Sequence, residues 1–507
     1  MDARGGLTGV TGRYHDHTKY HPATIHTLQR PLATGRMPSP FNEPDNVPLL
    51  DLTPWLPAGD EWRSDAALVD HRMALEAAWR DFGRLSQMLY LSYGITGVIR
   101  TPQQQFLMRA APSAGALYPA DLYLVVTRDG CLEAGVYLYQ PRQHVLARVA
   151  GPPAVDAWAA AHLDDAVTSH DGLWVVLAGH FPRSSWRYQA RAYRRVLLDT
   201  GHLWANLMEV ASLVGYQAVP CAAFRDHDLN QMLGLHPGFE GALMVVALVD
   251  HPERAAWSKG FPPLRNAVTQ DSVEYLPDDP DACIWVTHEA CNLEQATIPG
   301  TEEPSAEPIW RSLGELVRLP HSDEGWQDRL GATLLKRRST RAFEHVAWSL
   351  ETLGGILKNA YGPLLANGLR DHIKTYVVAH AIVGLDEGAY HYDPVAHTLR
   401  QTRFRNLKVA CGHLALGQAL AEDATAIVFH TANLGVAQRR FDERAYRYLH
   451  LMCGAIGQLL NLNAVARGMG ASGIGGFFDD DVNETLGIPD GEAVLYITTL
   501  GVPRNPD

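Results

Sequence analysis

The stretch RYQARAYR (residues 187–194) recurs as RFDERAYR (residues 440–447), and the two are separated by 253 residues. Two further pairs show the same separation: GVYLYQP (135–141) with GAYHYDP (388–394), and LNQMLGL (229–235) with VNETLGI (482–488). A constant separation across three matches indicates an internal duplication. Upstream, YG at 93–94 matches YG at 361–362 at a separation of 268, so the copies differ by 15 residues between these landmarks.

Each copy predicts an α+β domain. Short runs rich in β-forming residues predict strands at 121–126, 174–178 and 242–249 in copy one, and at 375–380, 426–430 and 493–499 in copy two. Stretches 193–214 and 446–468 are apolar at helical spacing and predict a central core helix in each copy. We therefore expect two fused α+β domains. The predicted organisation is a Pro-rich leader (1–60), copy one (61–250), a Pro-rich acidic linker (251–328) and copy two (329–507).

Bulk composition narrows the class of protein. The chain has 507 residues, too many for one compact core, and its net charge of −13 argues against a nucleic-acid partner. No apolar run is long enough to span a bilayer, and the polar start has no signal-peptide core, so we expect no membrane association. Six sparse cysteines without a C-x-x-C pair favour a reducing cytoplasm. His15 and His17 alternate in a polar segment and form a weak ligand set, so we expect no metal site.

Copy two opens with KRRSTRAF (336–343), in which Arg337, Arg338, Ser339 and Arg341 lie close together. Guanidinium groups match phosphate oxygens and remain charged, so this cluster is suited to grip a phosphate. The alternative is a solvated, basic start of a helix.

Copy one contains RAAPSAGALYP (109–119), in which Pro112, Ser113, Ala114 and Gly115 combine a turn with small side chains. This composition lets the backbone approach a flat ring closely and leaves amide groups available as donors. The alternative is an ordinary turn.

Copy two has a second glycine-rich candidate in GIGGFF (473–478), with Ile474, Gly475 and Gly476 as candidate ligand contacts. Together with Gly468 and Gly470 this segment spells G-x-G-x-x-G. That dinucleotide fingerprint must follow a strand and open a helix. Here it follows a predicted helix, so we interpret the glycines as a helix cap and a loop.

These motifs resemble the nitroreductase-like FMN flavoproteins, and within them the SagB-type (thiazoline/oxazoline) peptide dehydrogenases. The resemblance rests on the R-R-S-x-R-x-F start, the P-S-A-G-A-L-Y-P segment, the I-G-G-F loop before L-G-I-P, and GVPR (501–504) with Arg504. YHDHTKY (14–20) resembles the leader of the SagB-type branch. The resemblance implies an FMN cofactor held between two subunits. One subunit supplies the R-R-S segment and the late glycine loop, and the other supplies the P-S segment.

In this chain the R-R-S and I-G-G-F motifs occur only in copy two, whereas P-S-A-G occurs only in copy one. At the separation of 268, residues 337–339 align with 69–71, where Asp70 would repel a phosphate. We therefore expect an intramolecular pseudo-dimer with one composite FMN site and a mirror site that has lost its function. In solution the chain would be a monomeric pseudo-dimer or a homo-oligomer of it.

Azoline dehydrogenases resemble one another in a Lys-Tyr pair near the start of the core helix, where this chain has Arg187 and Tyr188. Arginine cannot serve as a general base, but Tyr188 can if a nearby guanidinium lowers its pKa. The alternative for Tyr188 is a structural residue at the entrance of the helix. In copy two the matching residue is Phe441, which has no proton to exchange.

The expected function is an FMN-dependent dehydrogenase that tailors a biosynthetic peptide, by azoline-to-azole or a related two-electron oxidation. Its partners would be a peptide or peptide-derived substrate and other biosynthetic enzymes or a carrier. Two alternatives stay open: an NAD(P)H-dependent reductase of small acceptors, and a flavin-free scaffold in a biosynthetic complex.

Overall fold

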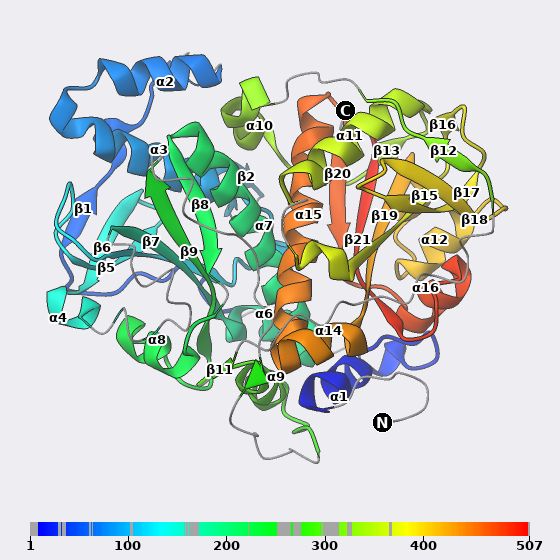
Figure 1. Cartoon of the computed structure of the whole chain (residues 1–507), viewed down its shortest axis with the longest axis horizontal. Helices are drawn as coiled ribbons and strands as arrows, with labels where there is room; N and C mark the ends of the chain where they lie inside the picture. The colour runs from blue at the N-terminus through cyan, green and yellow to red at the C-terminus, as the bar shows by residue number, and fades with distance from the viewer. Residues whose placement is uncertain are drawn as a thin grey trace. The chain divides into compact units, whose positions relative to one another are not determined.

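The duplication can be followed element by element in the computed structural model (Figure 1). The structure describes residues 9–28, 32, 37–59, 62, 64–101, 105–156, 158, 161, 172–221, 223–250, 265–266, 275–294, 296–297, 314–321, 327–364 and 368–504. The chain divides into two units: unit 1 comprises Met1–Leu32, Gly300–Trp326 and Arg337–Asp507, and unit 2 comprises Ala33–Pro299 and Gln327–Lys336. The Pro-rich acidic stretch 299–308 of the predicted linker lies outside the described residues.

Unit 2 is built on a seven-stranded sheet in the order β1-β6-β5-β4-β7-β9-β8, with all neighbouring strands antiparallel. The strands are β1 (Leu49–Asp51), β4 (Ala120–Val126), β5 (Gly135–Gln140), β6 (Val145–Ala150), β7 (Leu173–His180), β8 (Tyr216–Cys221) and β9 (Glu240–Asp250). Core helix α7 (Ala192–Leu213) packs against α3 (Arg80–Tyr93) and the central strands. On the other face of the sheet, strand residues such as Val125 pack with α8 (Asp226–Leu233) in a second apolar cluster. Successive side chains of a strand point to opposite faces, so the sheet has one helical layer on each face.

Unit 1 repeats this design, with a sheet in the order β12-β18-β17-β15-β19-β21-β13 and β20 added against β21. Its strands are β12 (Leu316–Arg318), β13 (Phe343–Glu344), β15 (Ile373–Ala379), β17 (Gly388–Asp393), β18 (Thr398–Arg403), β19 (Ala426–Asn433), β20 (Gly470–Ile474) and β21 (Glu492–Pro503). The long helix α15 (Ala445–Ala466) packs with α11 (Leu350–Tyr361) and β21, while α12 (Lys408–Leu414) and α16 (Asp479–Leu486) share another core cluster with the sheet. Figure 1 shows α15 in orange alongside β20 and β21.

Corresponding elements begin 253 residues apart, which confirms the duplication and both predicted core helices. The pairs are β4 and β15, β5 and β17, β6 and β18, β7 and β19, α6 (Phe181–Tyr188) and α14 (Leu434–Phe441), α7 and α15, and α8 and α16. Gln189 and Asp442 end α6 and α14 in the left-handed region, with φ of 51° and 53°. The extra residues of copy one form a hairpin of β2 (Ile95–Arg100) and β3 (Gln105–Arg109) before β4.

The predicted leader and linker both contribute helices that belong to the repeat. Helix α1 (Gly9–His17) precedes copy one in the chain but belongs to unit 1, whereas α9 (Pro280–Ala290) precedes copy two and belongs to unit 2. Likewise β1 pairs with β6, and β12 pairs with β18. The interval predicted as a linker therefore contains a second leader helix, α9. Each unit contains segments from more than one of the predicted regions, so the unit boundaries differ from the predicted domain boundaries.

The two leader helices make matching contacts. His15 Nδ1 lies 3.3 Å from the Tyr446 hydroxyl, and His288 Nδ1 lies 3.2 Å from the Tyr193 hydroxyl. Tyr193 and Tyr446 correspond at the separation of 253. Because the same bond recurs at the same place on each core helix, we infer that the leader was duplicated together with the domain. The buried ring of His15 thus packs in the fold and is not part of an irregular surface segment.

The glycines after α15 only partly follow the expectation. Gly468 has φ of 73° and follows the helix end, as expected for a cap. The predicted loop is wrong at its start, because Gly470–Ile474 forms strand β20 paired with β21. Pairing with a neighbouring strand outweighs the low strand propensity of glycine here.

Within the described residues, one helical stretch, Leu434–Ala466, is long and apolar enough to span a membrane. However, 89% of its most apolar window is buried inside the structure, as expected for a core helix.

Candidate functional site

The phosphate-binding candidates of copy two lie together at one end of β21. The N–H of Thr340 donates to the carbonyl of Ala471 at 2.9 Å, which ties the R-R-S segment to β20. The N–H of Arg504 donates to the carbonyl of Ala342 at 3.0 Å, and the Arg504 guanidinium donates to the Phe343 carbonyl at 2.9 Å. The sequence-predicted cluster is therefore assembled from two ends of unit 1 that are more than 130 residues apart in the chain.

The side chains of this cluster differ in exposure. Arg337 is buried and only 1% exposed, whereas Arg341 and Arg504 are exposed. Arg338 and Ser339 are half-buried, and the Arg338 guanidinium donates to the Arg337 carbonyl at 2.6 Å. Four arginines and a serine are thus carried by two segments that are hydrogen-bonded to each other. This donor set fits a phosphate group, because each guanidinium offers several N–H donors and a permanent positive charge.

In unit 2 the P-S-A-G segment forms a tight turn with unusual backbone angles. Gly115, Ala116 and Tyr118 all have positive φ, of 65°, 55° and 47°. The left-handed region is unfavourable for residues with a Cβ, so Ala116 and Tyr118 are held there by surrounding contacts. The Tyr118 hydroxyl accepts the N–H of Arg109 at 3.0 Å, and the Tyr118 carbonyl accepts from Arg183 at 3.2 Å. The turn is consequently not an ordinary solvent-exposed loop.

Asp199 of α7 binds the first half of the turn. The Ser113 hydroxyl donates to one Asp199 oxygen at 2.6 Å, and the Ala114 N–H lies 3.1 and 3.2 Å from the two oxygens. The Ser113 Oγ also accepts the N–H of Tyr118 at 2.9 Å. Asp199 therefore anchors a short network that reaches both ends of the turn.

Burial raises the pKa of Asp199 to about 7, against the opposing effects of the hydrogen bonds from Ser113 and Ala114 and of the positive charge of Arg195. The carboxyl thus titrates near neutral pH. Asp199 and Arg195 were not predicted from the sequence. Their signal was available in the copy comparison, since the matching residues in copy two are Met452 and Tyr448.

Arg187 and Tyr188 lie against the same turn. A Cβ added to Gly115 would lie 2.8 Å from the Tyr188 hydroxyl oxygen and 3.3 Å from Cδ of Arg187. The Arg195 guanidinium carbon lies 3.8 Å from the centre of the Tyr188 ring, and that of Arg187 lies 5.7 Å from it. The structure therefore brings the predicted turn and the predicted catalytic pair together within unit 2.

The mirror positions lack these features. Residues 69–71, which align with the R-R-S segment, lie inside helix α2 (Asp65–Ala74) and not in a loop, and Asp70 is exposed. In unit 1 the residue that matches Tyr188 is the buried Phe441. The asymmetry of the two copies thus extends from sequence to local structure.

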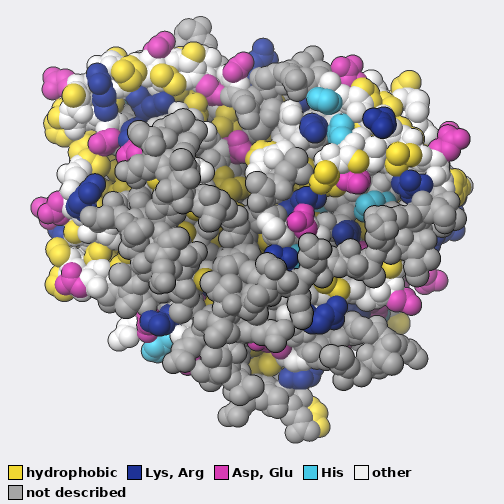
Figure 2. Space-filling view, in the orientation of Figure 1, with side chains coloured by type: hydrophobic (Ala, Val, Ile, Leu, Met, Phe, Trp, Pro, Cys, Tyr) yellow, Lys and Arg dark blue, Asp and Glu magenta, His cyan; other side chains and the backbone are white. Residues whose placement is uncertain are grey.

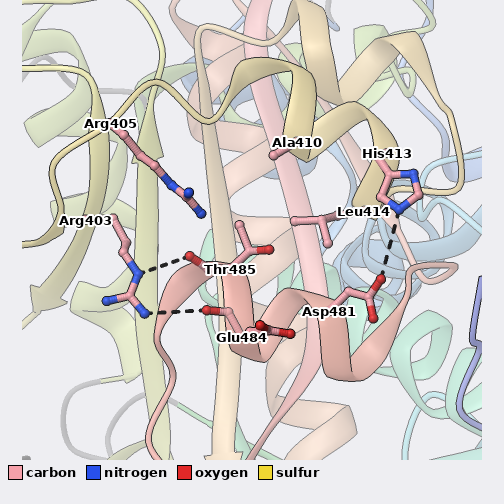
Figure 3. A pocket seen from close by; sticks show the side chains of 8 residues that line it. All are labelled: Arg403, Arg405, Ala410, His413, Leu414, Asp481, Glu484 and Thr485. Atoms are coloured by element: carbon pink, nitrogen blue, oxygen red, sulfur yellow. Dashed lines mark hydrogen bonds and ion pairs between the residues drawn. The ribbon is translucent and has the colours of Figure 1, made fainter.

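A separate hollow of about 570 Å³ in unit 1 contains none of the predicted site residues (Figure 3). Its most prominent cation, Arg403, donates to the carbonyls of Thr485 and Glu484 at the end of α16. Arg403 therefore caps a helix, which is a structural role. His413 lies 4.0 Å from Asp481 on the opposite wall.

Charged side chains of both signs are interspersed over the described surface seen in Figure 2. No field of Lys and Arg that would suit a nucleic-acid backbone is visible on that face of the described part. Within the described residues, no group of three or more His, Cys, Asp or Glu side chains could hold a metal ion.

The sheet order and the buried core helix define an α+β domain that is present twice, and the basic cluster at the sheet end belongs to copy two. The Nitroreductase family model matches residues 73–248 and 334–502, so the chain belongs to the nitroreductase family, whose members are generally flavin oxidoreductases.

Similar proteins agree with this assignment. A crystal structure of a protein from Anabaena variabilis named as a nitroreductase superposes with a TM-score of 0.85 at 33% identity, covering 98% of this chain and all of that one. A protein of Methanocaldococcus jannaschii named as a nitroreductase is 30% identical over 184 residues, covering 34% of this chain and 89% of its own. The trifolitoxin-processing protein TfxB of Rhizobium leguminosarum bv. trifolii is 29% identical over 152 residues, covering 29% of this chain and 41% of its own.

Proposed function

We propose that the chain binds one FMN and oxidises a peptide-derived substrate by two electrons. The observation that carries this proposal is the division of the machinery between the copies. The phosphate-type cluster is in unit 1, whereas the glycine turn with Tyr188 is in unit 2. Each half lacks a counterpart in the other copy.

In this proposal Arg337, Arg338, Ser339, Arg341 and Arg504 hold the FMN phosphate by charge-assisted hydrogen bonds. The backbone at 474–476 lies directly after β20, and β20 is joined to the R-R-S segment by the Thr340–Ala471 hydrogen bond. Ile474, Gly475 and Gly476 would therefore contact the ligand beside the phosphate. In copy one the aligned segment 69–71 lies within α2, which supports a mirror site without function.

The turn at 112–115 would contact the flat ring from copy one. Its small side chains suit close approach of a planar group to the backbone. Support for this assignment comes from the packing of Tyr188 and Arg187 against the same glycine. The residues that contact the flavin ring and the residues that act on the substrate would thus belong to the same unit.

Bound FMN would supply the two-electron acceptor of the oxidation. The protein's part is to remove the proton that the substrate loses in the same step. We assign this to Tyr188, whose ionised Oη would take the proton, and the guanidinium groups of Arg195 and Arg187 lie near its ring. The substrate loses two hydrogens in total, one as a proton to Tyr188 and the other with the electron pair.

A peptide substrate is supported by two features. The chain is similar to a protein named for processing trifolitoxin. Its leader, 14–20, resembles that of the SagB-type peptide dehydrogenases and packs in the fold through Tyr14 and His15. The cytoplasm, with other biosynthetic enzymes or a carrier as partners, is the setting that we propose.

The test has three readouts. The purified chain should be yellow and release about one FMN on denaturation. A candidate peptide should lose the mass of two hydrogens in the presence of the protein and oxygen. Rapid bleaching of the flavin by NADPH without peptide oxidation would favour a reductase of small acceptors, and a colourless protein that takes up no FMN would favour a scaffold.

A further inference from the structure

Asp199 is a buried acidic side chain on core helix α7 with no counterpart in copy two. Its side chain is 8% exposed, and Met452 occupies the matching place on α15. A carboxylate is costly to bury unless hydrogen bonds satisfy it. Here the donors are the Ser113 hydroxyl and the Ala114 N–H, both from the P-S-A-G turn.

These contacts hold the turn at more than one point. Ser113 donates to Asp199 at 2.6 Å and at the same time accepts the Tyr118 N–H at 2.9 Å. Ala116, which has a positive φ, lies between these two attachments, and Tyr118, which also has a positive φ, forms the second one. The backbone would relax toward more favourable angles if the attachments were lost.

The far side of the turn faces Tyr188. Gly115 follows Ala114 directly, and a Cβ there would lie 2.8 Å from the Tyr188 hydroxyl oxygen. A shift of the turn of even one ångström would therefore move the backbone against, or away from, the proposed catalytic hydroxyl. Arg195, one helical turn before Asp199 on α7, places its guanidinium carbon 3.8 Å from the ring centre of the same tyrosine.

We propose that Asp199 is a positioning residue, which holds the turn at 113–118 in the shape that receives the flavin ring beside Tyr188. The proposal rests on the proposed function for the identity of the ligand. Asp199 acts through the turn and does not itself contact the ligand or the reacting atoms. Because copy two has Met452 and no such turn motif, the role is confined to copy one.

The experiment compares Asp199→Asn with Glu209→Gln. Glu209 lies ten residues further along the same helix, and its pKa is raised to about 7 by burial alone. Both substitutions remove a carboxyl from α7 whose pKa is raised by desolvation, so a general effect on the helix should appear in both. Ser113→Ala removes the hydroxyl that donates to Asp199 and leaves α7 unchanged. It therefore tests the same hydrogen bond even if a substitution in α7 disturbs folding.

Two measurements are made on the full chain. Hydrogen exchange in the apoprotein follows the Ala114 and Tyr118 amides, and quenching of flavin fluorescence measures the Kd of FMN. Both are made at pH 8.5, where Asp199 is ionised, because a hydrogen bond to a charged acceptor contributes more than one to a neutral acceptor. Asp199→Asn should therefore speed exchange in 110–120 by about tenfold and weaken FMN by a similar factor. Ser113→Ala should do the same, and Glu209→Gln should do neither.

The outcomes separate the two proposals. Unchanged exchange in 110–120 for Asp199→Asn overturns the positioning role, and so does an equal effect of Glu209→Gln. If the wild-type chain takes up no FMN, the proposed function fails, while the exchange rates of the apoprotein still decide whether Asp199 holds the turn.

Discussion

Asp199→Asn should make the chain more stable at high pH while leaving its stability at low pH nearly unchanged. Asparagine has the same shape as aspartate but cannot ionise. The pKa of Asp199 is raised in the folded state from 3.8 to about 7, mainly by burial. The carboxyl therefore favours its protonated form when the protein is folded.

The magnitude follows from linkage between protonation and folding. A raised folded-state pKa contributes stability that is fully present below the unfolded pKa and is lost as the pH rises through the folded pKa. Each tenfold change in proton affinity is worth about 1.4 kcal/mol. The shift from 3.8 to about 7 thus makes ionised Asp199 cost on the order of 4 kcal/mol above neutral pH.

Thermal unfolding of the two proteins between pH 4 and pH 8.5 measures this cost. Near pH 4 the folded state holds Asp199 in its neutral form and little of the linkage cost has developed, so the Tm values should lie close together. By pH 8.5 the variant should unfold higher by on the order of 10 °C, since about 1 kcal/mol shifts a unit of this size by a few degrees. Other titrating groups act equally in both proteins, so the difference between them reports on Asp199.

Ser113→Ala serves as the matched control. It keeps the carboxyl but removes a hydrogen bond that lowers its pKa. Ser113→Ala should therefore move the loss of stability to higher pH. A constant Tm difference between wild type and Asp199→Asn across the pH range would refute the reasoning, because it would mean that the carboxyl does not change its charge in this window.

Other predictions concern the ligand and the leader. Arg338→Ala should weaken FMN binding by about 10- to 100-fold through loss of a charge-assisted contact, and Asp70→Ala should leave the Kd unchanged; equal effects would contradict the assignment. Released FMN should amount to about one per chain by absorbance, and a ratio near two would rule out a single site. Tyr188→Phe should keep FMN and lower peptide oxidation by roughly 10²–10⁴-fold; turnover within a few-fold of wild type would place the base elsewhere. Deletion of residues 1–20 should speed hydrogen exchange near Glu443, which caps α1 through the N–H groups of Val10 and Thr11 at 3.0 Å, and an unchanged rate there would show that α1 does not protect this surface.

The sequence was sufficient for the parts of the fold that rest on periodicity. Core helices 193–214 and 446–468 were predicted within two residues of α7 and α15, because apolar spacing determines which helix is buried. The second leader was missed. Its helix α9 lies among proline-rich and acidic segments, and its match to α1 is a pattern of contacts and not of sequence letters.

The candidate site shows a similar limit. The turn at 112–115 and the pair Arg187 and Tyr188 belong to sequence motifs, so they could be predicted as site residues from the sequence. Asp199 is a single acidic residue in an apolar helix, where sequence alone does not distinguish a functional residue from a tolerated one. The role inferred for Asp199 depends on its 2.6 Å hydrogen bond with Ser113, which is 86 residues away in the sequence.

Comparison of the two copies separates structural residues from candidate functional ones. Tyr139 and His144 in copy one are hydrogen-bonded at 2.9 Å, and the matching Tyr392 and His397 at 3.0 Å. Such bonds maintain the fold, which both copies need, so they occur in both.

Three positions in and near the core helix behave differently. Tyr188, Arg195 and Asp199 are matched by Phe441, Tyr448 and Met452, so the hydroxyl is lost at the first position and the charge at the other two. These changes fall on the residues that surround the turn at 112–115, while the frame around them is unchanged. If both copies served equivalent sites, each would need this set. We therefore expect a chain in which Phe441, Tyr448 and Met452 are replaced by Tyr, Arg and Asp to gain no second FMN, because copy one still has Asp70 within α2 where a phosphate-binding loop is required.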